Sequence, residues 1–112
     1  MGTLVLEPRK TEAIEIWPRV LREGDAMHIA FRAARVVGAL NVPRYTVRVL
    51  DGRGRTIATL FRGTARAAGG VVCVEWDGRD NDGASVPAGL YRIHVERPRP
   101  EPALERILQV ER

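Results

Sequence analysis

Hydrophobic and polar residues alternate along most of the chain. Residues 26–32 place Met27, Ile29 and Phe31 on one face, with His28 and Arg32 on the other. This period of two is typical of a β-strand that buries one face. Three further segments alternate in the same way, and their predicted inner residues are Tyr45, Val47 and Val49; Val72, Val74 and Trp76; and Tyr91, Ile93 and Val95.

Weaker patterns predict three more strands. Residues 12–17 alternate and stop at Pro18, which is typical of a first strand at a sheet edge. Residues 56–61 are rich in β-branched side chains and follow a turn. Residues 106–110 form a candidate last strand. Residues 103–108 also have the spacing of a helix, so strand and helix both stay open there.

Turn chemistry separates these strands. Gly-rich and Asx-rich segments interrupt the alternation at residues 51–54, 67–70 and 77–83, and alternate prolines keep residues 97–102 extended. Residues 33–42 carry no clear pattern, and we expect a loop between two sheets. Short strands with turns at this spacing predict an all-β sandwich of about seven antiparallel strands.

The composition fits one folded domain. The chain has 112 residues, 45% of them hydrophobic and 29% charged, which excludes disorder. We predict an N-terminal arm at residues 1–10, the sandwich at 11–97, and a Pro-rich connection with the last strand at 98–112. No apolar run reaches the roughly 18 residues of a membrane helix, and the N-terminus lacks a signal-peptide pattern. Localisation therefore stays open between the cytoplasm and export as part of a filament or particle without a cleaved signal.

A longer motif runs from Trp76 to Tyr91 and reads W-D-G-R-D-N-D-G-A-S-V-P-A-G-L-Y. Together with the preceding strand and the D-G-R-G-R turn, it resembles the FlgD-type immunoglobulin-like domain of the flagellar hook-capping protein family. The matching positions are Trp76, Asp77, Gly78, Asp80, Gly83, Val86, Pro87, Ala88, Gly89 and Tyr91. The resemblance covers about half of the chain.

The resemblance implies an immunoglobulin- or fibronectin type III-like β-sandwich that acts in protein–protein assembly, without catalytic residues or cofactors. The family's hook-targeting segment and tudor-like barrel have no match before residue 45 or after residue 95, so we expect a module that docks onto other copies or onto a larger assembly. Two alternatives stay open. One is an accessory protein of a virus-like tail or capsid, and the other is a carbohydrate- or ligand-binding module that uses Trp17.

The motif also has a purely physical interpretation. Trp76 continues an inner strand face, so we expect it in the core. Asp77 and Asp80 can accept backbone N–H bonds within the turn, and Pro87 fixes φ ahead of the next strand. The three glycines of the motif, Gly78, Gly83 and Gly89, allow conformations that a Cβ would obstruct.

A calcium loop is the competing interpretation of residues 77–83. If Asp80 and Asp82 were its third and fifth ligands, the first and twelfth positions would be Gly78 and Gly89, which offer no carboxylate. An Asx-rich turn without metal is therefore the prediction.

The excess of 18 basic over 14 acidic residues gives a net charge of +4 and raises the question of nucleic acid. The candidate phosphate-binding residues are Arg32, Arg48, Arg53, Arg55, Arg62, Arg66 and Arg92. Glu75 and Glu96 share the predicted outer faces, and no aromatic residue is interleaved for base stacking. We therefore predict a solvated charged surface rather than a nucleic-acid site.

The remaining reactive residues do not form a recognised catalytic or metal motif. His28 and His94 are predicted on outer faces without a third ligand nearby, and Cys73 cannot form an intrachain disulfide. No nucleophile or phosphate-binding motif occurs, so we predict that the protein is not an enzyme.

Two segments are candidate interfaces with other protein subunits, including copies of this chain. Val71 and Cys73 are predicted on the outer face of one strand, where they form a mildly apolar surface. In the N-terminal arm, Leu4, Val5 and Leu6 form an extended, apolar stretch ahead of Pro8. Such a stretch can add a strand to the sheet edge of a neighbour, and a frayed terminus is the alternative.

Overall fold

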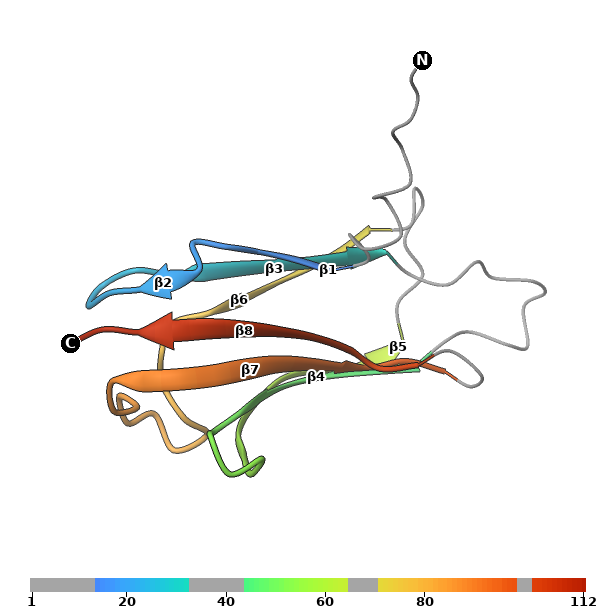
Figure 1. The fold of residues 1–112 in the computed structure, drawn as a ribbon. Coiled ribbons are helices and arrows are strands. Elements are labelled where there is room, and N and C mark those ends of the chain that lie inside the picture. Colours follow the sequence, from blue (N-terminus) through green and yellow to red (C-terminus); the bar gives the residue numbers. More distant parts are fainter. Residues whose placement is uncertain (1–13, 33–43, 65–70, 99–101) are drawn as a thin grey trace, which may run out of the picture.

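The computed structural model describes residues 14–32, 44–64, 71–98 and 102–112. These residues contain eight β-strands and no helix (Figure 1). The strands are β1 (Ile14–Trp17), β2 (Val20–Leu21), β3 (Met27–Arg32), β4 (Arg44–Leu50), β5 (Thr56–Thr64), β6 (Val71–Trp76), β7 (Gly89–Glu96) and β8 (Leu104–Val110). The predicted arm and the predicted loops at residues 33–42 and 67–70 lie outside the described residues.

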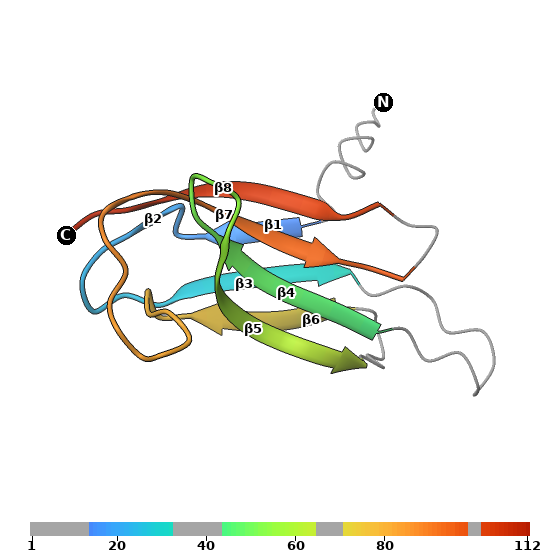
Figure 2. The same cartoon turned by 90° about the horizontal axis from the view of Figure 1, so that it is seen from below.

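The strands form two sheets that pack face to face (Figures 1 and 2). One sheet has the order β1-β3-β6, and the other has the order β2-β8-β7-β4-β5. The prediction of an all-β, immunoglobulin-like sandwich is confirmed. It differs in one detail, because the short pairing of β2 with β8 is parallel, whereas the other strand pairs are antiparallel.

The core lies between the sheets and consists of the alternate residues that the sequence pattern assigned to the inner faces. Met27, Ile29 and Phe31 of β3 are at most 2% exposed. From the facing sheet, the inner residues of β4 and β7 are also buried, namely Tyr45, Val47, Val49, Tyr91, Ile93 and Val95. The period-two prediction is confirmed for these three strands. Val72 and Val74 of β6 are only half-buried, because β6 lies at the edge of its sheet.

The first strand ends at Trp17, as the following Pro18 predicted, since proline has no N–H to donate to a strand partner. The chain then changes sheets. β1 pairs with β3, whereas β2 pairs with β8 through Val20 and Leu21. The sequence analysis missed β2 because two residues are too few to show a period. Leu21 is nevertheless 2% exposed and belongs to the core.

The ambiguous C-terminal segment is a strand. β8 pairs with β7 along its whole length and buries Leu108 and Val110, while Ile107 is 63% exposed. A helix would have placed Leu104, Ile107 and Leu108 on one face. The pairing with β7 instead imposes a period of two, so neighbouring residues point to opposite faces.

The β4–β5 hairpin is built on Asp51. Its carboxylate accepts the backbone N–H groups of Arg53 and Arg55, each at 2.9 Å. The N–H of Arg55, more than any other group, lowers the pKa of Asp51 below its ordinary value. β5 runs three residues past its predicted end at Phe61, to Thr64, and its register against β4 shifts twice. In the described part of the chain there is no helix with the length and apolar character needed to span a membrane.

Candidate functional site: the Trp76–Tyr91 corner and the open sheet edges

The segment between β6 and β7 carries the family-like motif and forms a closed corner. Three backbone hydrogen bonds fold it onto itself: the N–H of Asp80 to the carbonyl of Ala84 at 2.8 Å, that of Gly83 to Asp80 at 3.0 Å, and that of Val86 to Gly78 at 3.0 Å. Val86 is 4% exposed and joins the core. The corner is therefore attached to the sandwich at its middle as well as at its ends.

Trp76 anchors the start of the corner. Its side chain is 2% exposed, and the indole N–H donates to the carbonyl of Arg79 at 2.8 Å. The ring packs edge-on against Tyr91, with 6.1 Å between the ring centroids. One side chain thus fills the core and satisfies a loop carbonyl.

Tyr91 anchors the end of the corner. Its ring is 7% exposed, and its hydroxyl donates to the carbonyl of Pro87, four residues upstream. Burial raises the pKa of the Tyr91 phenol above its ordinary value. A tyrosine that bonds back to the preceding backbone is a recurring corner of immunoglobulin-like sandwiches.

The two motif carboxylates are occupied by backbone groups. Asp77 accepts the N–H of Arg79 at 3.1 Å, and one oxygen of Asp80 accepts the N–H groups of Asp82 and Ala84, each at 2.9 Å. Within the described residues, no group of three or more His, Cys, Asp or Glu side chains could hold a metal ion. The arrangement is that of an Asx-rich turn.

Gly78 is the motif glycine with the strictest steric requirement. Its φ is 83°, and a Cβ built there would lie 3.2 Å from a methyl carbon of Leu21 and 3.2 Å from the guanidinium of Arg112. Gly83 also has positive φ, at 85°, but has open space around it. Gly83, Pro87 and Gly89 are exposed.

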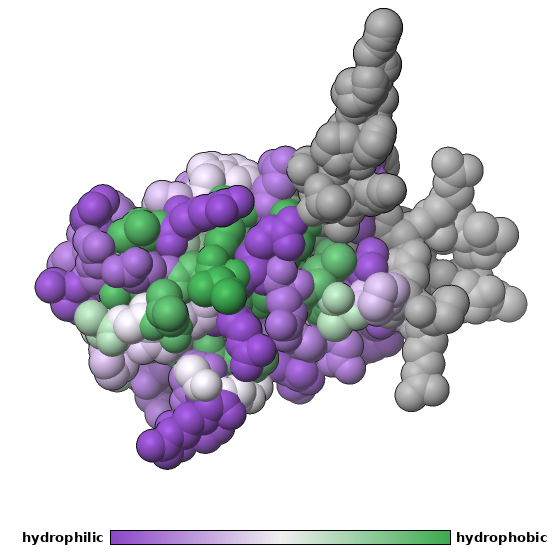
Figure 3. Space-filling model, in the orientation of Figure 1, coloured by the Kyte–Doolittle hydropathy of each residue, from purple (hydrophilic) through white to green (hydrophobic). Residues whose placement is uncertain are grey.

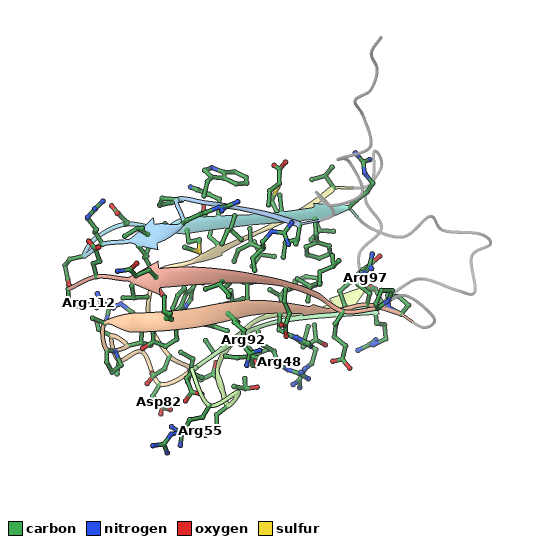
Figure 4. All side chains as sticks on the ribbon, in the orientation of Figure 1. Arg48, Arg55, Asp82, Arg92, Arg97 and Arg112 are labelled. Carbon is green, nitrogen blue, oxygen red and sulfur yellow. The ribbon has the colours of Figure 1, made fainter. Side chains whose placement is uncertain are left out.

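Two residues that the sequence analysis missed hold the corner in place. Arg112 donates to the carbonyls of Val86 at 3.0 Å and Gly78 at 3.1 Å (Figure 4 labels Arg112). Asn81 connects the corner to β5, because its N–H donates to Ile57 and its side-chain oxygen accepts the N–H of Thr59. Asn81 lies within the motif, but not at one of its matching positions, and Arg112 lies outside it; each acts on a segment distant in the sequence, which no local pattern marks.

The arginines on the strands are divided between the two outer faces. Arg48 and Arg92 lie on the five-stranded sheet (Figure 4), where Arg48 pairs with Glu96 at 3.3 Å and Arg92 with Glu105 at 3.5 Å. Arg32 lies on β3 in the other sheet, and Arg66 lies outside the described residues. These ion pairs form a mixed-charge surface on the five-stranded sheet.

The two histidines lie in different sheets, so they do not form a pair. His28, on β3, contacts Glu75 at 3.2 Å, and His94, on β7, contacts Glu105 at 2.7 Å.

The exposed large hydrophobic residues of the described structure are Trp17, Val71, Leu90 and Ile107. Of these, Trp17 and Val71 belong to the binding sites that the sequence predicted. Trp17 is 47% exposed and stacks on His28, with 5.4 Å between the ring centroids. Beside Trp17 lies a hollow of about 420 Å³, which is bordered by β1 and by Arg106 of β8. It lies on the side of the molecule that Figure 3 shows, where hydrophobic residues reach the surface. On β6, Val71 is 50% exposed and Cys73 is exposed. Leu4, Val5 and Leu6 lie outside the described residues.

A family model described as the FlgD Ig-like domain matches residues 28–100. The chain belongs to this family. The match begins at the second residue of β3 and includes β4 through β7 with the whole corner.

Known relatives of this FlgD Ig-like domain include the basal-body rod modification protein FlgD of Salmonella typhimurium, which is 40% identical over 52 residues. FlgD of Salmonella typhi matches to the same extent. The match covers 46% of this chain and 22% of the Salmonella typhimurium protein, so this chain corresponds to only a small part of that relative.

Two solved structures share the fold of this FlgD Ig-like domain. PorZ of Porphyromonas gingivalis, an essential bacterial surface component of the type-IX secretion system, aligns over 91% of this chain and 12% of its own, with a TM-score of 0.58 and 23% identity. FlgD of Pseudomonas aeruginosa aligns over 87% of this chain and 66% of its own, with a TM-score of 0.52 and 18% identity. At these identities the likeness concerns the fold alone.

Truncating Trp76 tests its role as the anchor of this FlgD Ig-like domain. Trp76→Ala should lower the free energy of unfolding by about 3–5 kcal/mol, because loss of a buried aromatic side chain leaves a cavity. The matched control is Trp17→Ala, which removes an exposed indole and should cost less than about 1 kcal/mol. Urea denaturation measures both. A loss below about 1 kcal/mol for Trp76→Ala would contradict its place in the core.

Metal addition tests the Asx-rich turn. Neither calcium nor EDTA should change the melting temperature of the domain, because Asp77 and Asp80 already accept backbone N–H bonds. Differential scanning calorimetry in both conditions is the measurement. A dose-dependent rise of several degrees with calcium would show binding to the native state and refute the metal-free interpretation.

Proposed function

We propose that this FlgD Ig-like domain is a non-enzymatic assembly module that makes protein–protein contacts within a larger filament or surface assembly, similar to the flagellar hook cap. Family membership supports the proposal, as do the Salmonella relatives, which are basal-body rod modification proteins. The relatives are longer than the matched region, so the role of this chain in rod or hook assembly is inferred from one shared domain.

The observation that carries the proposal is the self-contained bonding of the corner. The polar groups of Trp76, Asp77, Asp80 and Tyr91 bond to backbone within the same corner. Their chemistry is thus used to shape and hold the loop. A motif of this kind builds a rigid scaffold, and a rigid scaffold with open sheet edges is suited to docking other subunits.

The contact surfaces follow from the same reasoning. Val71 and Cys73 are exposed on the edge strand β6, and the apolar residues Leu4, Val5 and Leu6 of the arm can pair with a sheet edge. Strand addition supplies backbone hydrogen bonds for affinity and alternate side chains for specificity. We assign these two segments to contacts between subunits.

Deleting residues 1–7 tests this function. We expect the melting temperature to change little, because the proposal places the arm on a neighbouring subunit, and we expect self-association or co-assembly to be lost. Size-exclusion chromatography with light scattering, on the domain alone and mixed with purified rod or hook subunits, measures association. The proposal fails if the full chain associates with nothing. If the deletion unfolds the domain, the arm belongs to the fold rather than to an interface.

Ligand binding at Trp17 is a second candidate function, favoured by the exposed indole beside its hollow. A flat indole can stack on a sugar ring or another planar apolar face, and Glu15 and Arg19 at the same hollow offer polar contacts.

Tryptophan fluorescence tests the second function. Trp76 is buried, so soluble oligosaccharides that bind at Trp17 should change the emission of the exposed indole in a saturable way. The change should vanish in Trp17→Ala and persist in Arg62→Ala, a surface control on β5. A titration without change, or one that survives Trp17→Ala, would exclude this candidate.

A further inference from the structure

The outer edge of β6 is a regular, open strand. β6 pairs with β3 over six consecutive positions without a register shift, and no described strand pairs with its other side. Such an edge presents a row of backbone N–H and C=O groups that can template another strand.

The other sheet edges in the described structure are shorter or blunted. β5 has two register shifts against β4, and Asn81 already bonds its outer backbone at Ile57 and Thr59. β2 has two residues, and β1 stops at Trp17, before Pro18. Bulges, caps and short strands are the features by which natural sheets avoid edge pairing. β6 lacks these features.

The core is also incomplete beside β6. The partly buried hydrophobic residues that pack against the core are Ile57, Leu60, Phe61, Val72, Val74 and Leu104, and all but Leu104 lie on β5 or β6. Figure 2 shows these two strands on the same side of the sandwich. Val72 and Val74 are half-buried, although their partners on β3, Phe31 and Ile29, are 2% and 0% exposed. A strand added to β6 would extend the inner face over this apolar side.

We propose that the β6 edge of one copy receives residues 3–6 of the arm of a neighbouring copy. This inference rests on the proposed assembly function and names the surface that accepts the arm. The pattern of the arm fits the edge: Leu4 and Leu6 share one face of an extended strand, and Val5 points to the other. Leu4 and Leu6 then continue the inner row of Val72 and Val74, while Val5 lies on the outer face beside Cys73.

The sheet order sets the geometry of the contact between neighbouring copies. The arm leads into β1, and β1 and β6 lie at opposite edges of the same sheet, with β3 between them. A donor at one edge and an acceptor at the opposite edge make a heterologous, head-to-tail contact. Such contacts generate rings when they close and filaments when they do not, which suits the proposed function.

The single native cysteine makes this contact testable by disulfide crosslinking. The donor is the full chain with Val5→Cys and Cys73→Ser, carrying a mass tag, and the acceptor is the wild-type chain with its native Cys73. Oxidation of the mixture should join position 5 of the donor to Cys73 of the acceptor, because cross-strand neighbours lie within the reach of a disulfide. Peptide mass spectrometry identifies the joined positions.

Matched variants separate this contact from random collision. An acceptor with Cys73→Ser and Thr64→Cys places an exposed thiol on the β5 edge instead, and its yield should be at least tenfold lower. In the donor, Leu4→Glu with Leu6→Glu should abolish the crosslink, whereas Thr3→Glu, which changes the opposite face, should retain it. Thermal melts of all variants verify that the sandwich remains folded.

Each remaining outcome overturns the inference in a distinct way. An intrachain crosslink in Val5→Cys with native Cys73 would place the arm on its own β6. If the full chain associates but the crosslink does not form, or if β5 crosslinks equally well, β6 is not the acceptor. The proposed assembly function is unaffected by either result. A full chain with neither association nor crosslink would remove both.

Discussion

Burial of the Trp76 indole between the two sheets is the interaction on which the rest of the corner depends. Trp76 ends β6 in the three-stranded sheet, and Tyr91, against which it packs, begins the buried part of β7 in the five-stranded sheet. The ring contact therefore joins the sheets at the point where the chain crosses between them. The indole N–H must find an acceptor once it is buried, and the carbonyl of Arg79 meets that need while fixing the path of the loop.

The corner also depends on two segments that pack against it, β2 and the end of the chain after β8. Leu21 of β2 and Arg112, just after β8, both approach Gly78 so closely that a side chain there would meet them. Arg112 also pairs with Glu23 at 3.0 Å, which connects the end of the chain to the loop after β2. The parallel β2–β8 pairing is thus part of the same construction, because it brings Leu21 and Arg112 to the corner together.

In the function that we propose, the closed corner is the scaffold and the sheet edges make the contacts. Asn81 connects the corner to β5 and thereby occupies backbone groups at that edge. β6, on the same side of the sandwich, has no register shift against β3, and its inner residues Val72 and Val74 are half-buried. In the described structure, backbone groups at the β5 edge are therefore already bonded to Asn81, whereas those at the β6 edge are open to pairing with another strand. In the assembly module that we propose, this asymmetry would let one accepting edge define both the position and the direction of the partner.

The sequence by itself determined the inner faces of β3, β4 and β7, the Asx turns and the family motif. These follow from the two-residue period of a strand and from bonds between residues at most four apart, both of which a local pattern records. Only the tertiary structure decided that residues 104–110 are a strand, that β2 exists, that β6 is an edge and that Asn81 and Arg112 hold the corner. Those features depend on partners farther along the chain: 9 to 21 residues away for the pairing of β8 with β7, 22 for the bond of Asn81 to Thr59 and 89 for that of Arg112 to Glu23. Contacts at that separation are set by how the sheets pack, and no local alternation of hydrophobic and polar residues encodes them.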